Sequence, residues 1–259
     1  MESVVQPDPR RSSSEPVTEE YQAKPTASPA PLSAARWTWE WAKSILVAFS
    51  LFILIRTFLV EAFRIPTGSM ENTLLVGDFL LVNKAVYGAE IPGTGVRLPA
   101  FEQPRRGDIV VFVPPHEPDK NYVKRLVGLP GDELEMRHKV LIRNGKPLFE
   151  PYVIFTDQNN DLYVPSMMCQ VNYLAGGVDR TSYKPSRDNW GPLVVPPGKY
   201  FFLGDNRDDS EDSRYWCMAD RGAIRGEPLF IYYSFDPGTV QPVPWLLDVR
   251  WQRIGSTIH

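Results

Sequence analysis

The stretch Ile65-Pro66-Thr67-Gly68-Ser69-Met70 begins five residues after an apolar run that ends at Val60. Its proline and glycine predict a kinked turn rather than a helix, so we expect Ser69 to face solvent. The apolar run is long enough to cross a membrane, and the turn is therefore expected close to a bilayer surface. This junction separates an apolar helix from a region of short strands.

The apolar run extends from Trp41 to Val60, and its 20 residues would cover about 30 Å as a helix, the thickness of one hydrocarbon core. Trp37 and Trp39 precede it, and tryptophan is enriched where a helix meets the membrane interface. We therefore predict one transmembrane helix over residues 37–60.

Two other interpretations of this segment stay open. Arg56 shortens the uninterrupted apolar run, as in a buried or amphipathic helix. Val60-Glu61-Ala62 resembles the small-residue cleavage site of a signal peptide, although the leader would be unusually long. We expect an intact anchor, with Lys43 and Arg56 reaching the polar headgroups at its two ends.

Composition limits the remaining possibilities. Residues 1–36 hold six prolines, a serine cluster and Tyr21 as their single aromatic residue, which predicts a disordered tail. The net charge of −3 and the lack of a basic stripe with interleaved aromatic residues argue against a nucleic-acid partner. Cys169 and Cys217 lack the spacing of metal ligands, and both a disulfide and two free thiols stay open.

After residue 60 the sequence is typical of β structure. Short β-branched and aromatic runs alternate with Gly-Asp and Pro-Gly turns. The runs occupy residues 79–82, 109–113, 122–127, 200–203 and 229–233. We predict a mainly β fold, with a coiled antiparallel sheet as the catalytic domain over residues 61–135 and 199–259. The polar stretch 136–198 is predicted to be an insertion with a hairpin at Asn144-Gly145.

A serine nucleophile needs a base, and histidine is the usual one. The chain has three histidines, His116, His138 and His259, and none lies on a predicted strand next to a turn. A Ser/His pair is therefore disfavoured.

A lysine can replace histidine when burial lowers its pKa from about 10.4, because only the neutral amine accepts a proton. Lys124 lies among apolar neighbours in the predicted strand 122–127. Arg125 points to the opposite face of that strand, so one side chain can be buried while the other pairs with an acid. On composition alone, a surface lysine on an edge strand is the favoured interpretation of Lys124.

Several motifs occur together in an order that resembles the bacterial type I signal peptidases, membrane-anchored Ser/Lys serine proteases that remove signal peptides from exported proteins. The motifs are Ile65–Met70 with Gly77-Asp78-Phe79, Arg106-Gly107-Asp108-Ile109-Val110, Tyr122-Val123-Lys124-Arg125 with Gly128-Leu129-Pro130-Gly131-Asp132, Gly204–Ser210, Asp212–Trp216 and Arg253-Ile254-Gly255. The resemblance runs from about residue 60 to the C-terminus, apart from the insertion. Glu71-Asn72 departs from the family, which often has proline at the second of these places. The chain also has one predicted membrane segment where some members have two.

The resemblance implies a role for each residue of the site. Ser69 is the nucleophile and Lys124 the general base, while the Thr67 hydroxyl and the Ser69 backbone N–H form the oxyanion hole. Supporting roles fall to Ser210, which would hydrogen-bond Lys124, and to the pairs Asp205 with Arg125 and Asp212 with Arg214. No metal or cofactor is needed.

A substrate in extended form would add as a strand between the segment before Ser69 and the strand of Lys124. Shallow apolar pockets would admit small residues, alanine above all, one and three positions before the cut. We expect the pockets to be lined by Ile65, Met70, Leu74, Tyr122 and Val123. Simple core packing is the alternative for each of these five residues.

The resemblance also implies partners and a location. Preproteins that carry signal peptides and the lipid bilayer are the expected partners, and an association with the protein-export machinery is left open. The location would be the bacterial cytoplasmic membrane, with one span, the N-terminus inside and the catalytic domain on the outer face. The positive charges on either side of the span only lean towards that orientation.

Two further classes of protein stay open. A self-cleaving Ser/Lys protease of the repressor type would need an N-terminal DNA-binding domain, and residues 1–36 supply none. A membrane-anchored β domain that binds emerging chains without cutting them is the other, and an activity assay separates it from a peptidase.

Overall fold

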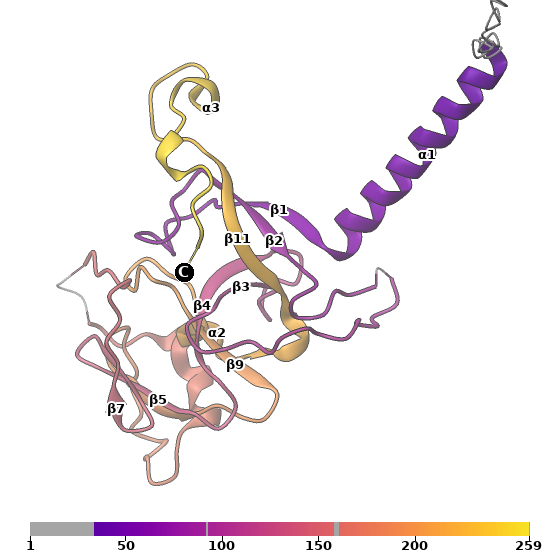
Figure 1. Ribbon diagram of the computed structural model, residues 1–259. Coiled ribbons are helices and arrows are strands. Elements are labelled where there is room, and N and C mark those ends of the chain that lie inside the picture. The colour runs from indigo at the N-terminus through magenta and orange to yellow at the C-terminus, as the bar shows by residue number, and fades with distance from the viewer. Residues whose placement is uncertain (1–33, 92, 158–160, 259) are drawn as a thin grey trace, which may run out of the picture. The chain divides into compact units, whose positions relative to one another are not determined.

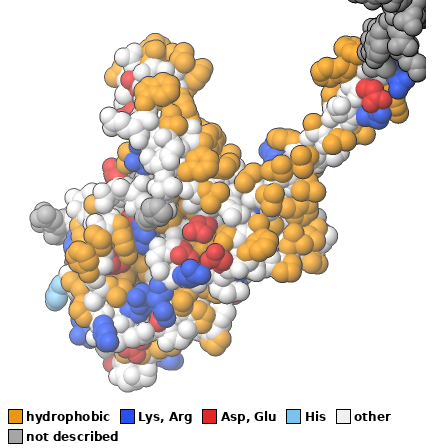
Figure 2. Space-filling model, viewed as in Figure 1, with side chains coloured by type: hydrophobic (Ala, Val, Ile, Leu, Met, Phe, Trp, Pro, Cys, Tyr) orange, Lys and Arg blue, Asp and Glu red, His pale blue; other side chains and the backbone are white. Residues whose placement is uncertain are grey.

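The computed structural model describes residues 34–91, 93–157 and 161–258 of the 259-residue chain. The predicted disordered tail lies outside the described residues except for 34–36, which already belong to helix α1 (Ala34–Phe58). Within α1, the segment Arg36–Phe58 has the length and apolar composition needed to cross a membrane. Its most apolar part is not buried against the rest of the described chain. Hydrophobic side chains line this helix in Figure 2.

The helix ends slightly earlier than the sequence suggests. Val60, predicted as its last residue, is the first residue of strand β1 (Val60–Arg64), which pairs with β2 (Asp78–Asn83). The described residues from 48 onward form one compact unit.

The compact unit contains an antiparallel sheet in the order β1-β2-β11-β3-β4-β9-β10 (Figure 1). The remaining strands of this sheet are β3 (Ile109–Phe112), β4 (Tyr122–Gly128), β9 (Lys199–Leu203), β10 (Ala219–Asp220) and β11 (Ile224–Ser234). All five predicted runs lie in it. Register shifts along β11 let its first part pair with β3 and its later part with β2, so the strand bends and the sheet curls. The prediction of a mainly β fold with a coiled antiparallel sheet is confirmed.

A second, smaller sheet has the order β7-β6-β5-β8. Its strands are β5 (Glu133–Arg137), β6 (Val140–Arg143), β7 (Lys146–Pro147) and β8 (Trp190–Val194), so it begins before the predicted insertion does. The hairpin at Asn144-Gly145 is confirmed, with φ of 53° and 74°. A second tight turn at His138-Lys139 was not predicted, because lysine is uncommon at positive φ.

Short helices connect the strands. They are α2 (Ser213–Trp216), α3 (Pro244–Leu247) and the 3₁₀ turns η1 (Pro165–Tyr173), η2 (Arg221–Ala223) and η3 (Trp251–Arg253). A disulfide between Cys169 and Cys217 joins η1 to the residue after α2. This settles a question that the sequence left open, since the two cysteines are 48 positions apart and only the fold brings them together.

One hydrophobic cluster holds the turn around Ser69 against the large sheet. Its members are buried side chains from the turn and from β2, β3 and β11: Ile65, Met70, Leu74, Leu80, Val82, Ile109, Val111 and Ile231. Burying such side chains stabilises a fold by about 1.5–3 kcal/mol each. The packing therefore fixes the position of the turn, although the turn contains no regular secondary structure.

Candidate active site

Ser69 lies on the turn between β1 and β2. The loop of residues 204–212, between β9 and α2, covers it. The side chain is only 8% exposed, so the expectation that it faces solvent was wrong. The backbone N–H of Asn206 donates to the Ser69 carbonyl at 3.2 Å. A Cβ on Gly204 would lie 2.4 Å from that same oxygen, so a glycine is required for this close approach.

Lys124 comes to Ser69 from strand β4. Its side chain is buried, and its Nζ donates to Ser69 Oγ at 2.5 Å. Within the described part of the chain, Lys124 forms no ion pair. Burial lowers the pKa of Lys124 to about 8, a shift that the negative charges of Asp212 and Glu211 partly oppose. The arrangement can therefore supply a neutral amine within hydrogen-bond reach of a hydroxyl at mildly alkaline pH.

Arg125, the next residue of β4, points to the other face of the sheet. Its guanidinium makes two parallel hydrogen bonds to the Asp205 carboxylate, at 2.8 and 2.7 Å. The Gly107 carbonyl accepts a third at 2.8 Å, and the guanidinium stacks 3.8 Å from the Tyr152 ring centroid. The structure thus brings together the predicted pair of Asp205 and Arg125, and it anchors the start of the loop that covers Ser69.

The predicted pair of Asp212 and Arg214 also forms. Both side chains are fully buried, and Arg214 Nε and Nη2 each donate to the Asp212 carboxylate at 2.8 Å. Burial alone opposes ionisation, but the Arg214 guanidinium holds the pKa of Asp212 below its usual range. Asp212 also accepts a hydrogen bond from the Gly204 backbone N–H, so the pair closes the loop over Ser69.

Ser210 does not bond Lys124, contrary to prediction. Ser210 Oγ is buried and has no hydrogen bond of good geometry in the structure. Its hydroxyl lies near enough to Asp212 to help lower the pKa of that carboxyl. The prediction fails because the Lys124 amine donates to Ser69 Oγ instead.

The predicted oxyanion-hole donors, the Thr67 hydroxyl and the Ser69 backbone N–H, lie on the turn that carries the nucleophile candidate. Thr67 is exposed, and its hydroxyl donates a long hydrogen bond of 3.5 Å to Ser69 Oγ. The Ser69 backbone N–H meets no acceptor in the ranges that the structure describes. The Thr67 hydroxyl is therefore a donor next to the Ser69 oxygen, and the Ser69 N–H has no acceptor among the described residues.

A cavity of about 530 Å³, named here the Ser69 cleft, opens in front of this pair. Of the five predicted pocket residues, Ile65, Met70, Tyr122 and Val123 line it. Leu74 does not, because it is fully buried in the cluster beneath the turn. The other lining residues are Phe63, Arg64, Pro66, Thr67, Ser69, Lys120, Asn121, Lys124, Asp209 and Glu211.

Asp209 and Glu211 are cleft residues that sequence reasoning missed. Both flank Ser210 in the motif that ends the loop, and acids in such a segment are more often ordinary turn residues. Their position next to Ser210 was the available signal. His116 lies 3.3 Å from Glu211 and stacks on Trp216, while His138 sits in a hairpin turn and His259 lies outside the described residues.

The family described as signal peptidase, peptidase S26, matches residues 38–233. Signal peptidase I of Pseudomonas aeruginosa is 41% identical over 181 residues, which cover 68% of this chain and 62% of that protein. Signal peptidase I of Buchnera aphidicola subsp. Acyrthosiphon pisum is 34% identical over 84% of this chain and 82% of its own length.

A third relative, signal peptidase I of Rickettsia felis, is 36% identical over 85% of this chain and 92% of its own length. Among solved structures, a signal peptidase I from Enterococcus faecalis is 29% identical and covers 49% of this chain and 98% of that one, with a TM-score of 0.34 that supports no conclusion. The match spans about three-fifths of the Pseudomonas protein but most of the other two relatives. The chain therefore belongs to the signal peptidase family, peptidase S26.

Proposed function

We propose that this chain is a membrane-anchored serine endopeptidase that removes signal peptides from exported preproteins and cuts after small residues. The observation that carries the proposal is the 2.5 Å contact between the Lys124 amine and Ser69 Oγ, at a site where burial lowers the lysine pKa. The names of the relatives, signal peptidase I, supply the substrate class.

The mechanism follows from this contact. Neutral Lys124 takes the proton of Ser69 Oγ, and the oxygen attacks the peptide carbonyl. The Ser69 backbone N–H and the Thr67 hydroxyl stabilise the oxyanion, a contribution of about 3–4 kcal/mol for a donor of this kind. The lysine ammonium then protonates the leaving amine, and the neutral lysine activates a water that hydrolyses the acyl-enzyme.

Support for the substrate's position comes from the walls of the Ser69 cleft. They are formed by the end of β1 with the turn after it and by the start of β4, so an extended peptide fits between two extended segments. Ile65, Met70 and Val123 present apolar surface there, which suits small apolar side chains before the cut. The pairs Asp205–Arg125 and Asp212–Arg214 act as supports that hold the loop of residues 204–212.

Helix α1 would be the anchor, placing residues 60–70 at the membrane surface. We assign the N-terminus to the inside of a bacterial cytoplasmic membrane and the catalytic domain to its outer face. Ala62 lies within β1, paired with Leu81, so a cut after Ala62 would require the strand to leave the sheet. We therefore expect the anchor to stay attached, and a chain that starts at Phe63 in mass spectrometry would contradict this.

The direct test is cleavage of a purified preprotein in detergent and lipid by the full chain and by Ser69→Ala and Lys124→Ala. We expect a cut after a small residue, read from the new N-terminus, that disappears in both variants. Lys199→Ala is the matched control, because that lysine pairs with Asp220 away from the cleft. Cleavage that survives Lys124→Ala would require another base, and no cleavage by the folded wild type would favour a binding protein.

A further inference from the structure

A second cavity lies beside the Ser69 cleft and has no part in the mechanism. Its volume is about 710 Å³, and we name it the acidic cavity. Its walls come from the loop before α2, from α2 itself, from the loop between β3 and β4, and from η1. The lining residues are Pro115, His116, Ser166, Asp208, Asp209, Ser210, Glu211, Tyr215 and Trp216.

The acidic cavity and the Ser69 cleft share a wall. Asp209 and Glu211 line both. A Cβ on Gly68 would lie 3.4 Å from Asp209 Oδ2, so this carboxylate stands directly beside the residue before Ser69. A peptide bound in the cleft therefore enters the acidic cavity once it passes Asp209 and Glu211. Because an extended chain advances about 3.3 Å per residue, a few residues are enough.

The three carboxylates of the acidic cavity differ in how far other residues of the chain already neutralise them. Asp208 is already paired with Lys139 and Arg187 at 3.3 and 3.1 Å. Asp209 forms no ion pair with any residue that the structure describes, and no Lys or Arg lines the cavity. Glu211 has His116 as its partner at 3.3 Å, an imidazole that neutralises it only when protonated. Asp209 and Glu211 are thus the charges that an incoming group would meet.

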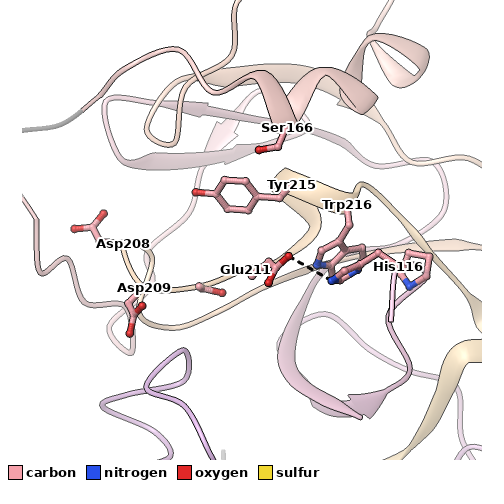
Figure 3. A pocket seen from close by; sticks show the side chains of 9 residues that line it. His116, Ser166, Asp208, Asp209, Glu211, Tyr215 and Trp216 are labelled. Carbon is pink, nitrogen blue, oxygen red and sulfur yellow. Dashed lines mark ion pairs between the residues drawn. The ribbon is translucent and has the colours of Figure 1, made fainter. Parts of the chain in front are cut away.

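Figure 3 shows the arrangement: Asp208 and Asp209 lie to one side, the rings of Trp216 and His116 to the other, and Glu211 between them. Two polar atoms of lining residues, Ser210 Oγ and Trp216 Nε1, are buried and have no hydrogen-bond partner in the described chain. Ser210 itself is 7% exposed.

We propose that the acidic cavity binds the first residues of the substrate after the cut, and that Asp209 and Glu211 make it prefer a basic side chain there over an acidic one. The inference rests on the proposed function for its occupant. The apolar surface of Ile65, Met70 and Val123 lies on the cleft side, which suits the segment before the cut. The acidic cavity lies beyond Asp209 and Glu211, where the leaving segment would continue.

The test measures binding without cleavage. The full chain with Ser69→Ala, in detergent, is titrated with labelled ten-residue peptides that carry Ala-Gly-Ala before the bond and Lys, Gln or Glu two places after it. Fluorescence anisotropy should give a Kd about tenfold lower for the Lys than for the Glu peptide, since exposed charge pairs contribute modestly. The ratio should shrink in 0.5 M salt.

Adding Asp209→Asn and Glu211→Gln should bring that ratio to about twofold or less, whereas adding Glu102→Gln, an exposed acid outside both cavities, should leave it unchanged. Equal binding of the three peptides, or the same ratio in the double variant as in the Glu102→Gln control, would overturn the proposal. The serine-containing chain is then given the same peptides. Discrimination in binding with no cleavage at all would refute the peptidase function and leave the acidic cavity's preference standing.

Discussion

Lys124 and Arg125 are neighbours on β4, equally buried at 4% and 3% exposure, yet they lie in opposite electrostatic surroundings. Arg125 has a carboxylate at 2.7 Å, a backbone carbonyl and an aromatic ring around it. Among the described residues, Lys124 has the Ser69 hydroxyl as its hydrogen-bond partner and the Tyr122 ring 5.4 Å away, but no acid in an ion pair. The alternation of a β-strand puts the two cations on opposite faces and so gives them different direct partners.

The difference shows how burial produces either structure or chemistry. A buried cation with a well-placed acid stays charged and fixes the elements around it. A buried cation without one loses its proton more easily, and the pKa of Lys124 falls to about 8. One strand thus supplies an anchor for the covering loop and a base for the nucleophile.

Exchanging the two cations is the strongest way to break this comparison. Lys124→Arg keeps charge and burial but supplies no neutral base, so we expect kcat/KM to fall by about 10⁴-fold or more. Arg125→Lys should retain activity within about tenfold, because it keeps a cation beside Asp205. Both are measured on a peptide substrate in detergent, and comparable losses in the two variants would mean that the faces are not functionally distinct.

Removing Arg125 tests its structural role. Arg125→Ala leaves Asp205 buried and unpaired, and we expect the free energy of unfolding to fall by about 3–5 kcal/mol. Urea unfolding followed by tryptophan fluorescence gives the value, with Arg105→Ala as a control because Arg105 is exposed. The double variant Arg125→Ala/Asp205→Ala should be more stable than the single one. A loss below 1 kcal/mol for Arg125→Ala would contradict the assignment.

Removing the charge at position 124 should raise the free energy of unfolding, whereas removing the charge at position 125 lowers it. The folded-state pKa of Lys124 is near 8, below the unfolded value of about 10.4, so stability rises with pH between these values and is lowest below pH 8. Lys124→Met should therefore raise the free energy of unfolding by about 2 kcal/mol at pH 7. This gain in the free energy of unfolding should vanish near pH 10. If Lys124→Met were less stable than the wild type at pH 7, the lysine would not be desolvated.

Glu211 gives the smallest expected effect. Its negative charge raises the pKa of Lys124, so Glu211→Gln should move the acid limb of the pH–kcat/KM profile to lower pH. The charge is exposed, and we expect a displacement of about a few tenths of a pH unit from a wild-type limb near pH 8. Glu102→Gln serves as the control, and a displacement to higher pH would give the wrong sign.

Much of the site was predictable because its residues sit in strands and turns that local sequence determines. The strand 122–127 placed Lys124 and Arg125 on opposite faces by alternation alone. The family resemblance supplied Asp205 as the partner of Arg125 across a long separation, and Asp212 as the partner of nearby Arg214. Both predicted ion pairs are present in the structure.

The errors arose where packing between distant segments decides. The burial of Ser69 depends on Asn206, far away in sequence, and Leu74 turned inward because the turn after Ser69 covers the core. The Cys169–Cys217 disulfide and the position of Asp209 beside Gly68 likewise depend on how the loop before α2 folds back. No local pattern encodes such contacts.

The most direct test of the central claim is the pKa of Lys124 itself. The full chain labelled with ¹³C at lysine Cε is titrated by NMR in detergent, and Lys124 is identified by the signal that disappears in Lys124→Met. We predict a midpoint near pH 8, while exposed lysines titrate above pH 10. A Lys124 signal that titrates together with the exposed lysines would contradict the account.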